Sequence, residues 1–201
     1  MKLLKHVIVI ASGETERRAL PHLLSHLRGE GIFIEAVRIP PRNRQLNLRT
    51  VESLVKSAWH EFSVRTVDKF VVLVDADGKP SEEVLQPLMN LSQRLGRDIT
   101  ANVQYAFAQW HLEAWFFADA TSLRQHLGRS LGQVDTSKPD EIQNPKLHLK
   151  NLLGRQVYTA RTAEEIASEM NPHTIAQRSP SFGMFLEAIQ NGPRHIDSKP
   201  A

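Results

Sequence analysis

Acidic residues that directly follow two apolar runs are the strongest candidates for chemistry in this sequence. Asp75 and Asp77 stand in "DADG" after the run "KFVVLV", and Glu14 stands in "SGETE" after the run "HVIVIA". Two unit charges about 4 Å apart repel by roughly 4 kcal/mol at an effective dielectric constant of about 20. If these carboxylates converge they need compensation, and Mg²⁺ or Mn²⁺ is the simplest one for ligands that are all oxygens.

The pattern of apolar residues predicts elements that would bring these carboxylates together. Residues 4–11, 32–39, 69–74 and 101–108 read as strands, and helices with apolar residues at helical spacing occupy 16–27 and 47–62. Alternating strands and helices predict a parallel sheet whose reactive edge lies at the carboxyl ends of the strands. If the first and third strands are neighbours, Glu14 and Asp75 share that edge. Asp77 then shares a strand face with Asp75, and Gly78 lets the backbone turn away.

The second half of the chain reads as mainly helical. A helix capped by Ser81 is predicted over 81–95, and further helices over 121–127, 145–153, 163–170 and 181–189. The expected fold is therefore α/β, with about four mainly parallel strands flanked by helices and a helical C-terminal extension. We expect an α/β catalytic core over 1–120, a helical extension packed on it over 121–191, and a flexible tail over 192–201.

Composition narrows the class of protein but not its partner. The chain has 201 residues, 41% of them apolar, and its net charge is only +3, which decides neither for nor against nucleic acid. It has no cysteine, which excludes disulfides and thiolate metal sites and suits a reducing compartment. No apolar run approaches the roughly 20 residues of a membrane-spanning helix, so we expect a cytoplasmic protein without a membrane partner.

Other proteins also carry an Asp-x-Asp-Gly motif, and Asp and Gly are common in plain turns, so the motif alone leaves a surface turn open. An EF-hand is excluded because the fifth and twelfth positions counted from Asp75 are Lys79 and Gln86. A phosphatase of the haloacid dehalogenase type stays a minor alternative. That class usually has the motif on its first strand, followed by Thr or Val, whereas here it follows the third strand.

Several further residues could contribute to a site at this edge. Glu113 follows the fourth strand and could be an additional metal ligand or a base that orients water. Asp119 lies about 120° away from it on a continuous helix, so the two could not both face one site, and Asp119 could instead cap the next helix near Ser122. The aromatic residues around Glu113 are expected in the core rather than as base-stacking platforms. Lys146 begins a predicted helix and could hold a phosphate, or could simply be solvated.

A basic stretch follows the second strand. Residues 38–49 contain four arginines and no acid. Arg42 and Arg44 would therefore lie near the edge that carries Glu14, where they could neutralise phosphates and steer a polyanion. A solvated loop explains the same residues equally well.

The order strand–"GETE"–helix followed by strand–"DAD" resembles the Toprim superfamily of topoisomerases, primases and nucleases. That resemblance implies that Glu14, Asp75 and Asp77 bind Mg²⁺ and act on phosphodiesters. With "HLEAWFFAD", "NPKLHLKNLL" and "SPSFGMFLEAI", the chain more narrowly resembles the Toprim-like domain-of-unknown-function (DUF) 4276 family, which is often encoded beside ATPases in bacterial defence islands.

The resemblance implies a metal-dependent nuclease that works with a partner ATPase, and a homodimer is possible. Asp75, Asp77 and Glu14 would form the catalytic and metal site, with Glu113 as a further catalytic residue. Arg42, Arg44 and Lys146 would contact phosphates. The competing hypothesis is a catalytically silent binding or regulatory subunit of an ATPase complex, because Lys79 follows the Asp-x-Asp motif closely.

Overall fold

A parallel four-stranded sheet forms the centre of the molecule. The computed structural model describes residues 4–42, 44–62, 67–99 and 101–191. The strands are β1 (Lys5–Ile10), β2 (Ile32–Arg38), β3 (Lys69–Asp75) and β4 (Asn102–Ala108), in the spatial order β2-β1-β3-β4. All three strand pairs are parallel, so the predicted α/β fold is confirmed. The first and third strands are neighbours, which is the condition that the sequence left open.

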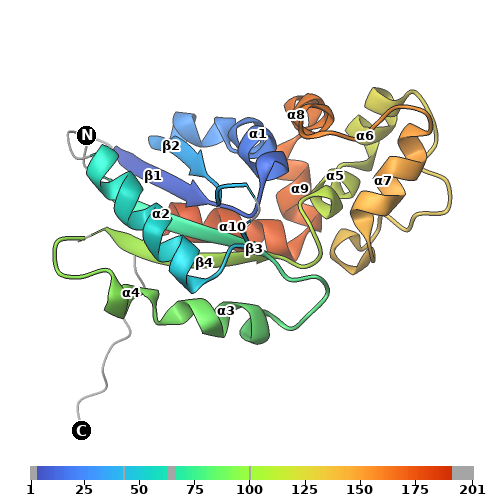
Figure 1. Ribbon diagram of the computed structural model, residues 1–201. Coiled ribbons are helices and arrows are strands. Elements are labelled where there is room, and N and C mark those ends of the chain that lie inside the picture. The colour runs from blue at the N-terminus through green and yellow to red at the C-terminus, as the bar shows by residue number, and fades with distance from the viewer. Residues whose placement is uncertain (1–3, 43, 63–66, 100, 192–201) are drawn as a thin grey trace, which may run out of the picture.

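Helices cover both faces of the sheet (Figure 1). The helices α2 (Leu48–Glu61), α3 (Ser81–Met89) and α4 (Leu91–Arg94) pack on one face, and α1 (Glu14–Leu23) and α10 (Pro180–Gln190) pack on the other. β3 is buried from both sides. Phe70 and Val72 pack in the apolar cluster under α2, α3 and α4, and Val71 and Leu73 pack in the cluster under α1 and α10. Its continuous apolar run is the pattern expected of a central parallel strand.

The helical part that follows β4 closes around one end of the sheet (Figure 1). It comprises α5 (Glu113–Ala118), α6 (Ala120–Leu127), the short 3₁₀ helix η2 (Pro139–Glu141), α7 (Pro145–Leu153), α8 (Ala160–Glu169), α9 (Pro172–Arg178) and α10. Another 3₁₀ helix, η1 (Ser25–Glu30), lies earlier in the chain, between α1 and β2. One apolar cluster runs from Val9 of β1 through Trp115 to Ile189, so these helices share a core with the sheet. The predicted domain boundary at residue 120 stays a prediction.

Some predicted helices differ from the structure at their ends. The predicted helix over 16–27 begins earlier, at Glu14, and continues as the 3₁₀ helix η1 after Leu24. The predicted helix over 81–95 is divided at Asn90, and Ser81 is its first helical residue rather than its cap, since Pro80 holds the cap position. The sequence analysis also missed α9, which is short and begins at Pro172. The predicted tail over 192–201 lies outside the described residues.

A buried lysine joins the amino end of β3 to the C-terminus of α10. The Lys69 side chain is 2% exposed, and its Nζ donates to the carbonyl oxygens of Ala188 at 2.7 Å and Ile189 at 3.1 Å and to that of Asn191. These carbonyls lie at or beyond the last turn of α10, where a helix has no internal donors for them. Burial lowers the pKa of Lys69 to about 8, with the charge of Lys5 as a second cause.

None of the helices in the described ranges is long and apolar enough to cross a membrane.

Candidate functional site

Three acidic side chains from different parts of the chain approach one another at the carboxyl ends of the strands. Glu16 lies in the first turn of α1, directly after β1. Asp75 is the last residue of β3, and Glu113 is the first residue of α5, after β4. The residue Glu16 is 6% exposed and Glu113 1% exposed, whereas Asp75 is partly buried. We call Glu16, Asp75 and Glu113 the acidic cluster.

The electrostatics of the acidic cluster are unfavourable. Burial, together with the charges of Asp75 and Glu113, raises the pKa of Glu16 to about 7. The pKa of Asp75 is also raised to about 7, mainly by burial and in addition by the charges of Glu113 and Asp77, while the hydrogen bond from Ser12 lowers it. The neighbouring carboxylates thus disfavour ionisation of Glu16 and Asp75, as like charges do in a poorly solvated place.

Two residues from the helical C-terminal part reach the cluster. The Lys146 Nζ of α7 lies 3.9 Å from the Glu113 Oε1, and the Tyr158 hydroxyl donates to the same oxygen at 2.8 Å. The charge of Lys146 also lowers the pKa values of Glu16 and Asp75, although less than burial raises them. On the sheet side, the Ser12 hydroxyl donates to the Asp75 Oδ2 at 2.9 Å. The site therefore combines residues from both halves of the chain.

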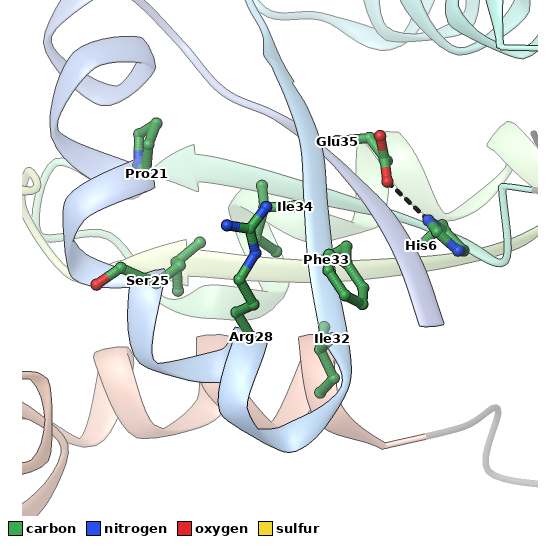
Figure 2. Close-up of a pocket in the computed structure, with 9 residues that line it drawn as sticks. His6, Pro21, Ser25, Arg28, Ile32, Phe33, Ile34 and Glu35 are labelled. Atoms are coloured by element: carbon green, nitrogen blue, oxygen red, sulfur yellow. Dashed lines mark hydrogen bonds and ion pairs between the residues drawn. The ribbon is translucent and has the colours of Figure 1, made fainter. Parts of the chain in front are cut away.

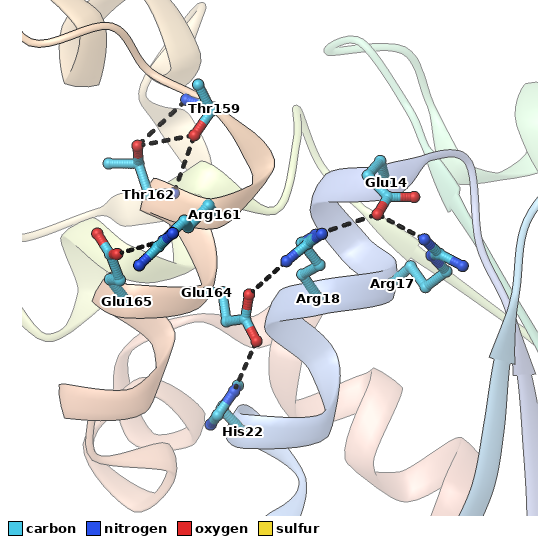
Figure 3. A network of polar contacts seen from close by, with 9 residues as sticks. All are labelled: Glu14, Arg17, Arg18, His22, Thr159, Arg161, Thr162, Glu164 and Glu165. Carbon is cyan, nitrogen blue, oxygen red and sulfur yellow. Dashed lines mark hydrogen bonds and ion pairs between the residues drawn. The ribbon is translucent and has the colours of Figure 1, made fainter.

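Glu14, the glutamate that the sequence analysis chose, makes its described contacts elsewhere (Figure 3). Its Oε1 accepts from the Arg17 Nη2 at 2.7 Å and from the Arg18 Nε at 3.1 Å, and its side chain is 40% exposed. The hydrogen bond from Arg17 is the main cause that lowers the pKa of Glu14. The metal and catalytic role of Glu14 stays a prediction, but the geometry favours Glu16 for that role.

The sequence contained a signal for Glu16 that the analysis missed. Residues two apart on a helix lie about 200° apart around its axis, so Glu14 and Glu16 cannot face the same side. Glu16 precedes Ala19, Leu20 and Leu23 by three, four and seven positions, which is the spacing of one helix face. All three residues are fully buried. The apolar face of the helix therefore carries Glu16 inward and leaves Glu14 outside.

Asp77 lies in the turn beyond the strand rather than on it. β3 ends at Asp75, and Asp77 has a positive φ of 50°, so the expectation that both share a strand face is wrong. The Asp77 side chain is 65% exposed, and its Oδ1 lies 3.0 Å from the His111 Nε2. Gly78, with φ 77°, is needed in this turn: a Cβ there would lie 2.6 Å from the Trp110 ring. Asp77 thus flanks the acidic cluster from the solvent side.

The remaining candidate residues fall into two groups. Asp119 caps α6, since it accepts from the Ser122 backbone N–H at 3.3 Å and from the Asn171 backbone N–H at 2.9 Å, which agrees with its predicted capping role. Trp115 and its neighbours Phe116 and Phe117 are fully buried, as expected of core residues. The structure places Arg42 and Arg44 at exposed positions of the loop after β2. Their predicted contacts with phosphate stay predictions.

A cavity of about 610 Å³ lies beside the edge strand β2 rather than at the acidic cluster (Figure 2). Its lining includes Phe33, which stacks on His6 at 5.6 Å between ring centroids and has the Arg28 guanidinium 5.5 Å from its own centroid. Glu35, the acidic residue in this lining, lies 2.7 Å from the His6 Nδ1. This cavity thus has no group of carboxylates that compares with the acidic cluster.

The acidic cluster fits a divalent cation by the chemistry of its donors. All of its ligand atoms would be carboxylate oxygens, which suit Mg²⁺ or Mn²⁺, and a cation would offset the repulsion that raises the two pKa values. With the side chains as they stand, no three His, Asp or Glu residues in the described ranges are close enough together to hold an ion. Side-chain movement would therefore have to accompany binding.

The fold and the site define a Rossmann-like α/β protein that carries acidic residues at the carboxyl edge of its sheet. The sequence profile of a family described as "Domain of unknown function (DUF4276)" matches residues 12–190. The chain therefore belongs to the DUF4276 family, as the narrower resemblance in the sequence indicated. No curated protein and no solved structure matches the chain.

Proposed function

We propose that this protein is a metal-dependent enzyme that cleaves the phosphodiesters of a nucleic acid. One observation carries the proposal: Glu16, Asp75 and Glu113, from three separate elements, lie near enough at the carboxyl edge of the sheet for their charges to act on one another, and Lys146 lies beside Glu113. Titratable groups with strongly shifted pKa values at the carboxyl edge of a parallel sheet are typical of reaction centres. The resemblance of "GETE" and "DAD" to the Toprim motifs supports the same activity.

In this proposal Glu16 and Asp75 would hold Mg²⁺ or Mn²⁺, with Asp77 at the solvent side. Such an ion polarises a phosphoryl oxygen and lowers the pKa of water. Lys146 is 44% exposed beside Glu113, so its ammonium group can contact solvent and a phosphate oxygen together. Glu113 would orient the attacking water or accept its proton.

The wider setting also belongs to the proposal. Arg42 and Arg44 are exposed on the loop that leaves the carboxyl end of β2, where they could contact the phosphates of a bound strand. Operation in the cytoplasm, a partner ATPase and a homodimer are the further expectations that the family resemblance and the composition raise.

One observation favours a second candidate, a catalytically silent binding subunit of an ATPase complex. The described carboxylates are not gathered into a ready metal site. A silent subunit could keep the fold and its acidic residues without the geometry for catalysis.

A cleavage assay with matched variants separates these candidates. Purified protein is incubated with plasmid, single-stranded DNA and tRNA in Mg²⁺, Mn²⁺ or EDTA, and with p-nitrophenyl phosphate and its diester to distinguish a phosphatase. The proposal predicts cleavage that EDTA abolishes and that Asp75→Asn and Glu16→Gln reduce by at least about 100-fold. Glu14→Gln is the control, because it alters a glutamate of the same helical turn that faces away.

Cleavage that survives in Asp75→Asn would contradict the proposal. The absence of cleavage with every substrate, alone and with an ATPase partner, would favour the silent subunit. Hydrolysis of the monoester alone would favour the phosphatase.

A further inference from the structure

Tyr158 connects the helical C-terminal part to the acidic cluster. Its hydroxyl donates to the Glu113 Oε1 at 2.8 Å, and the Lys146 Nζ lies 6.0 Å from the centroid of its ring. Burial raises the pKa of Tyr158, and the charge of Glu113 raises it further, so the phenol stays protonated and donates its hydrogen to the carboxylate. Nothing in the sequence pattern marks Tyr158, which lies 45 residues from Glu113.

The backbone around Tyr158 is held on both sides. Thr159, the next residue, caps α8 through a reciprocal pair of hydrogen bonds with Thr162 (Figure 3). The Thr162 hydroxyl also donates to the carbonyl oxygen of Val157, the residue before Tyr158, at 3.3 Å. Capping arrangements of this kind fix the path by which the chain enters a helix. The position of the Tyr158 ring is therefore set by the start of α8.

α8 is in turn fastened to the helix that carries Glu16. The Glu164 Oε2 of α8 lies 2.9 Å from the Arg18 Nη1 of α1, and the Glu164 Oε1 lies 3.7 Å from the His22 Nε2 (Figure 3). Ala163, Ile166 and Ala167 of α8 are buried in the same apolar cluster as Leu20 and Leu23 of α1. The packing of α8 on α1 thus brings Tyr158 and Glu16 to the same site.

The described polar contacts of the Glu113 carboxylate all go to one of its two oxygens. Both the Tyr158 hydroxyl and the Lys146 ammonium group approach Oε1. In the described part of the chain no further hydrogen bond to this carboxylate is found, so Oε2 can face a ligand or a water molecule. A hydroxyl that holds one oxygen of a carboxylate fixes the direction of the other, and losing such a contact commonly costs 10-fold to 100-fold in metal affinity or activity.

We propose that Tyr158 is a positioning residue that orients the Glu113 carboxylate in the acidic cluster, so that the segment before α8 completes the site. The proposal rests on the proposed function for its kinetic consequence, but the contact would also act on metal binding. Tyr158 itself does not touch the reacting atoms in this account.

The two tyrosines of the chain provide a matched pair of variants. Tyr158→Phe removes the hydroxyl and keeps the ring, whereas Tyr105→Phe removes a buried hydroxyl that has no hydrogen-bond partner among the residues that the structure describes. The full chain is measured in three ways: cleavage kinetics, Mn²⁺ affinity by calorimetry, and thermal unfolding. We expect Tyr158→Phe to lower kcat and Mn²⁺ affinity by about 10-fold or more, with KM changed little. Tyr105→Phe should resemble the wild type in both.

A double variant tests whether Tyr158 acts through Glu113. Glu113→Gln with Tyr158→Phe should be no worse than Glu113→Gln alone, because the second change then has nothing left to orient. Effects that simply multiply would overturn the proposal. So would a Tyr158→Phe protein with wild-type kinetics and Mn²⁺ affinity, or one that is unfolded, since the hydroxyl would then be structural.

The outcomes also separate this inference from the proposed function. A wild-type protein that binds Mn²⁺ but cleaves nothing would overturn the proposed function alone, and Tyr158 would be judged on Mn²⁺ affinity. A wild-type protein that neither binds Mn²⁺ nor cleaves would overturn both.

Discussion

The two ends of β3 carry ionisable residues with different kinds of partner: Lys69 at the amino end and Asp75 at the carboxyl end. At the amino end, Lys69 donates to the carbonyl oxygens of Ala188, Ile189 and Asn191, so its charge is matched by the C-terminus of α10. At the carboxyl end, Asp75 accepts one hydrogen bond from Ser12, and the charges of Glu113 and Asp77 disfavour its ionisation, while the charge of Lys146 favours it. Burial shifts the pKa of both residues toward the neutral form, but Lys69 has acceptors for its hydrogens within the fold, whereas Asp75 has like charges beside it.

This difference separates a structural charge from a functional one. A buried charge that the protein itself satisfies needs nothing else, and its removal leaves unsatisfied partners behind. A group of like charges lowers stability, so the fold gains nothing from Asp75, Glu16 and Glu113 unless something binds them. Local conflicts of this kind are expected at functional sites. The predictions below test each side of the contrast.

The largest effect on stability is expected at Lys69, at the amino end of β3. Lys69→Met removes the donor of the last α10 carbonyls and should lower the free energy of unfolding by about 2–4 kcal/mol. Lys5→Met is the matched control, because Lys5 donates to the single carbonyl of Gln190 at 2.6 Å and is partly exposed. Urea unfolding of both variants measures the difference. Equal losses of unfolding free energy in the two variants would show that the buried Lys69 contributes no more to stability than the partly exposed Lys5.

In the acidic cluster we expect a substitution to stabilise the protein instead of destabilising it. The pKa of Glu16 rises from 4.5 to about 7 on folding. Between these values the unfolded chain loses the proton first, so this carboxyl makes the wild type less stable as pH rises from about 4.5 to 7. Glu16→Gln removes that loss and should stabilise the protein by about 1–3 kcal/mol at pH 8, and by little at pH 4. Chemical unfolding without metal at both pH values tests it, and destabilisation at pH 8 would contradict the contrast.

The smallest effect is expected at Glu14, on the outer side of the same helical turn. Its pKa is lowered by Arg17, so its contribution to stability is present at neutral pH and is lost as pH falls through the lowered pKa. Because the pair is exposed, Glu14→Gln should cost about 0.5 kcal/mol or less at pH 7. Thermal unfolding at low and high salt measures it. A loss comparable to that of Lys69→Met would mean that the Glu14 network holds α1 in place.

Sequence patterns were sufficient to predict the sheet and the site residues that directly follow its strands, Asp75 and Glu113. The apolar run before Asp75 predicts β3 and its buried position, and Glu113 was placed correctly after the fourth strand. The choice between Glu14 and Glu16 depended on the helix face, which the positions of Leu20 and Leu23 could have decided. Asp77 was misplaced because β3 ends at Asp75, and Asp77, two residues further on, lies in a turn that Gly78 requires.

The contacts that Tyr158 and Lys146 make with Glu113 could not be predicted, because they depend on how distant helices pack. Tyr158 reaches Glu113 because α8 packs on α1, and this packing depends on many weak apolar contacts and the Arg18–Glu164 pair. No local spacing encodes such a contact. The sequence did suggest Lys146, which lies in the first turn of α7, but not the residue it would approach. Long-range partners of this kind are visible in the folded chain alone.

Titration of the wild type, Glu16→Gln and Glu14→Gln with Mn²⁺ by calorimetry at pH 8 tests the central claim most directly. The account predicts that the wild type and Glu14→Gln bind Mn²⁺ alike, and that Glu16→Gln binds at least about 10-fold more weakly. Equal affinity in Glu16→Gln and the wild type, or a loss confined to Glu14→Gln, would contradict a metal site built on the acidic cluster.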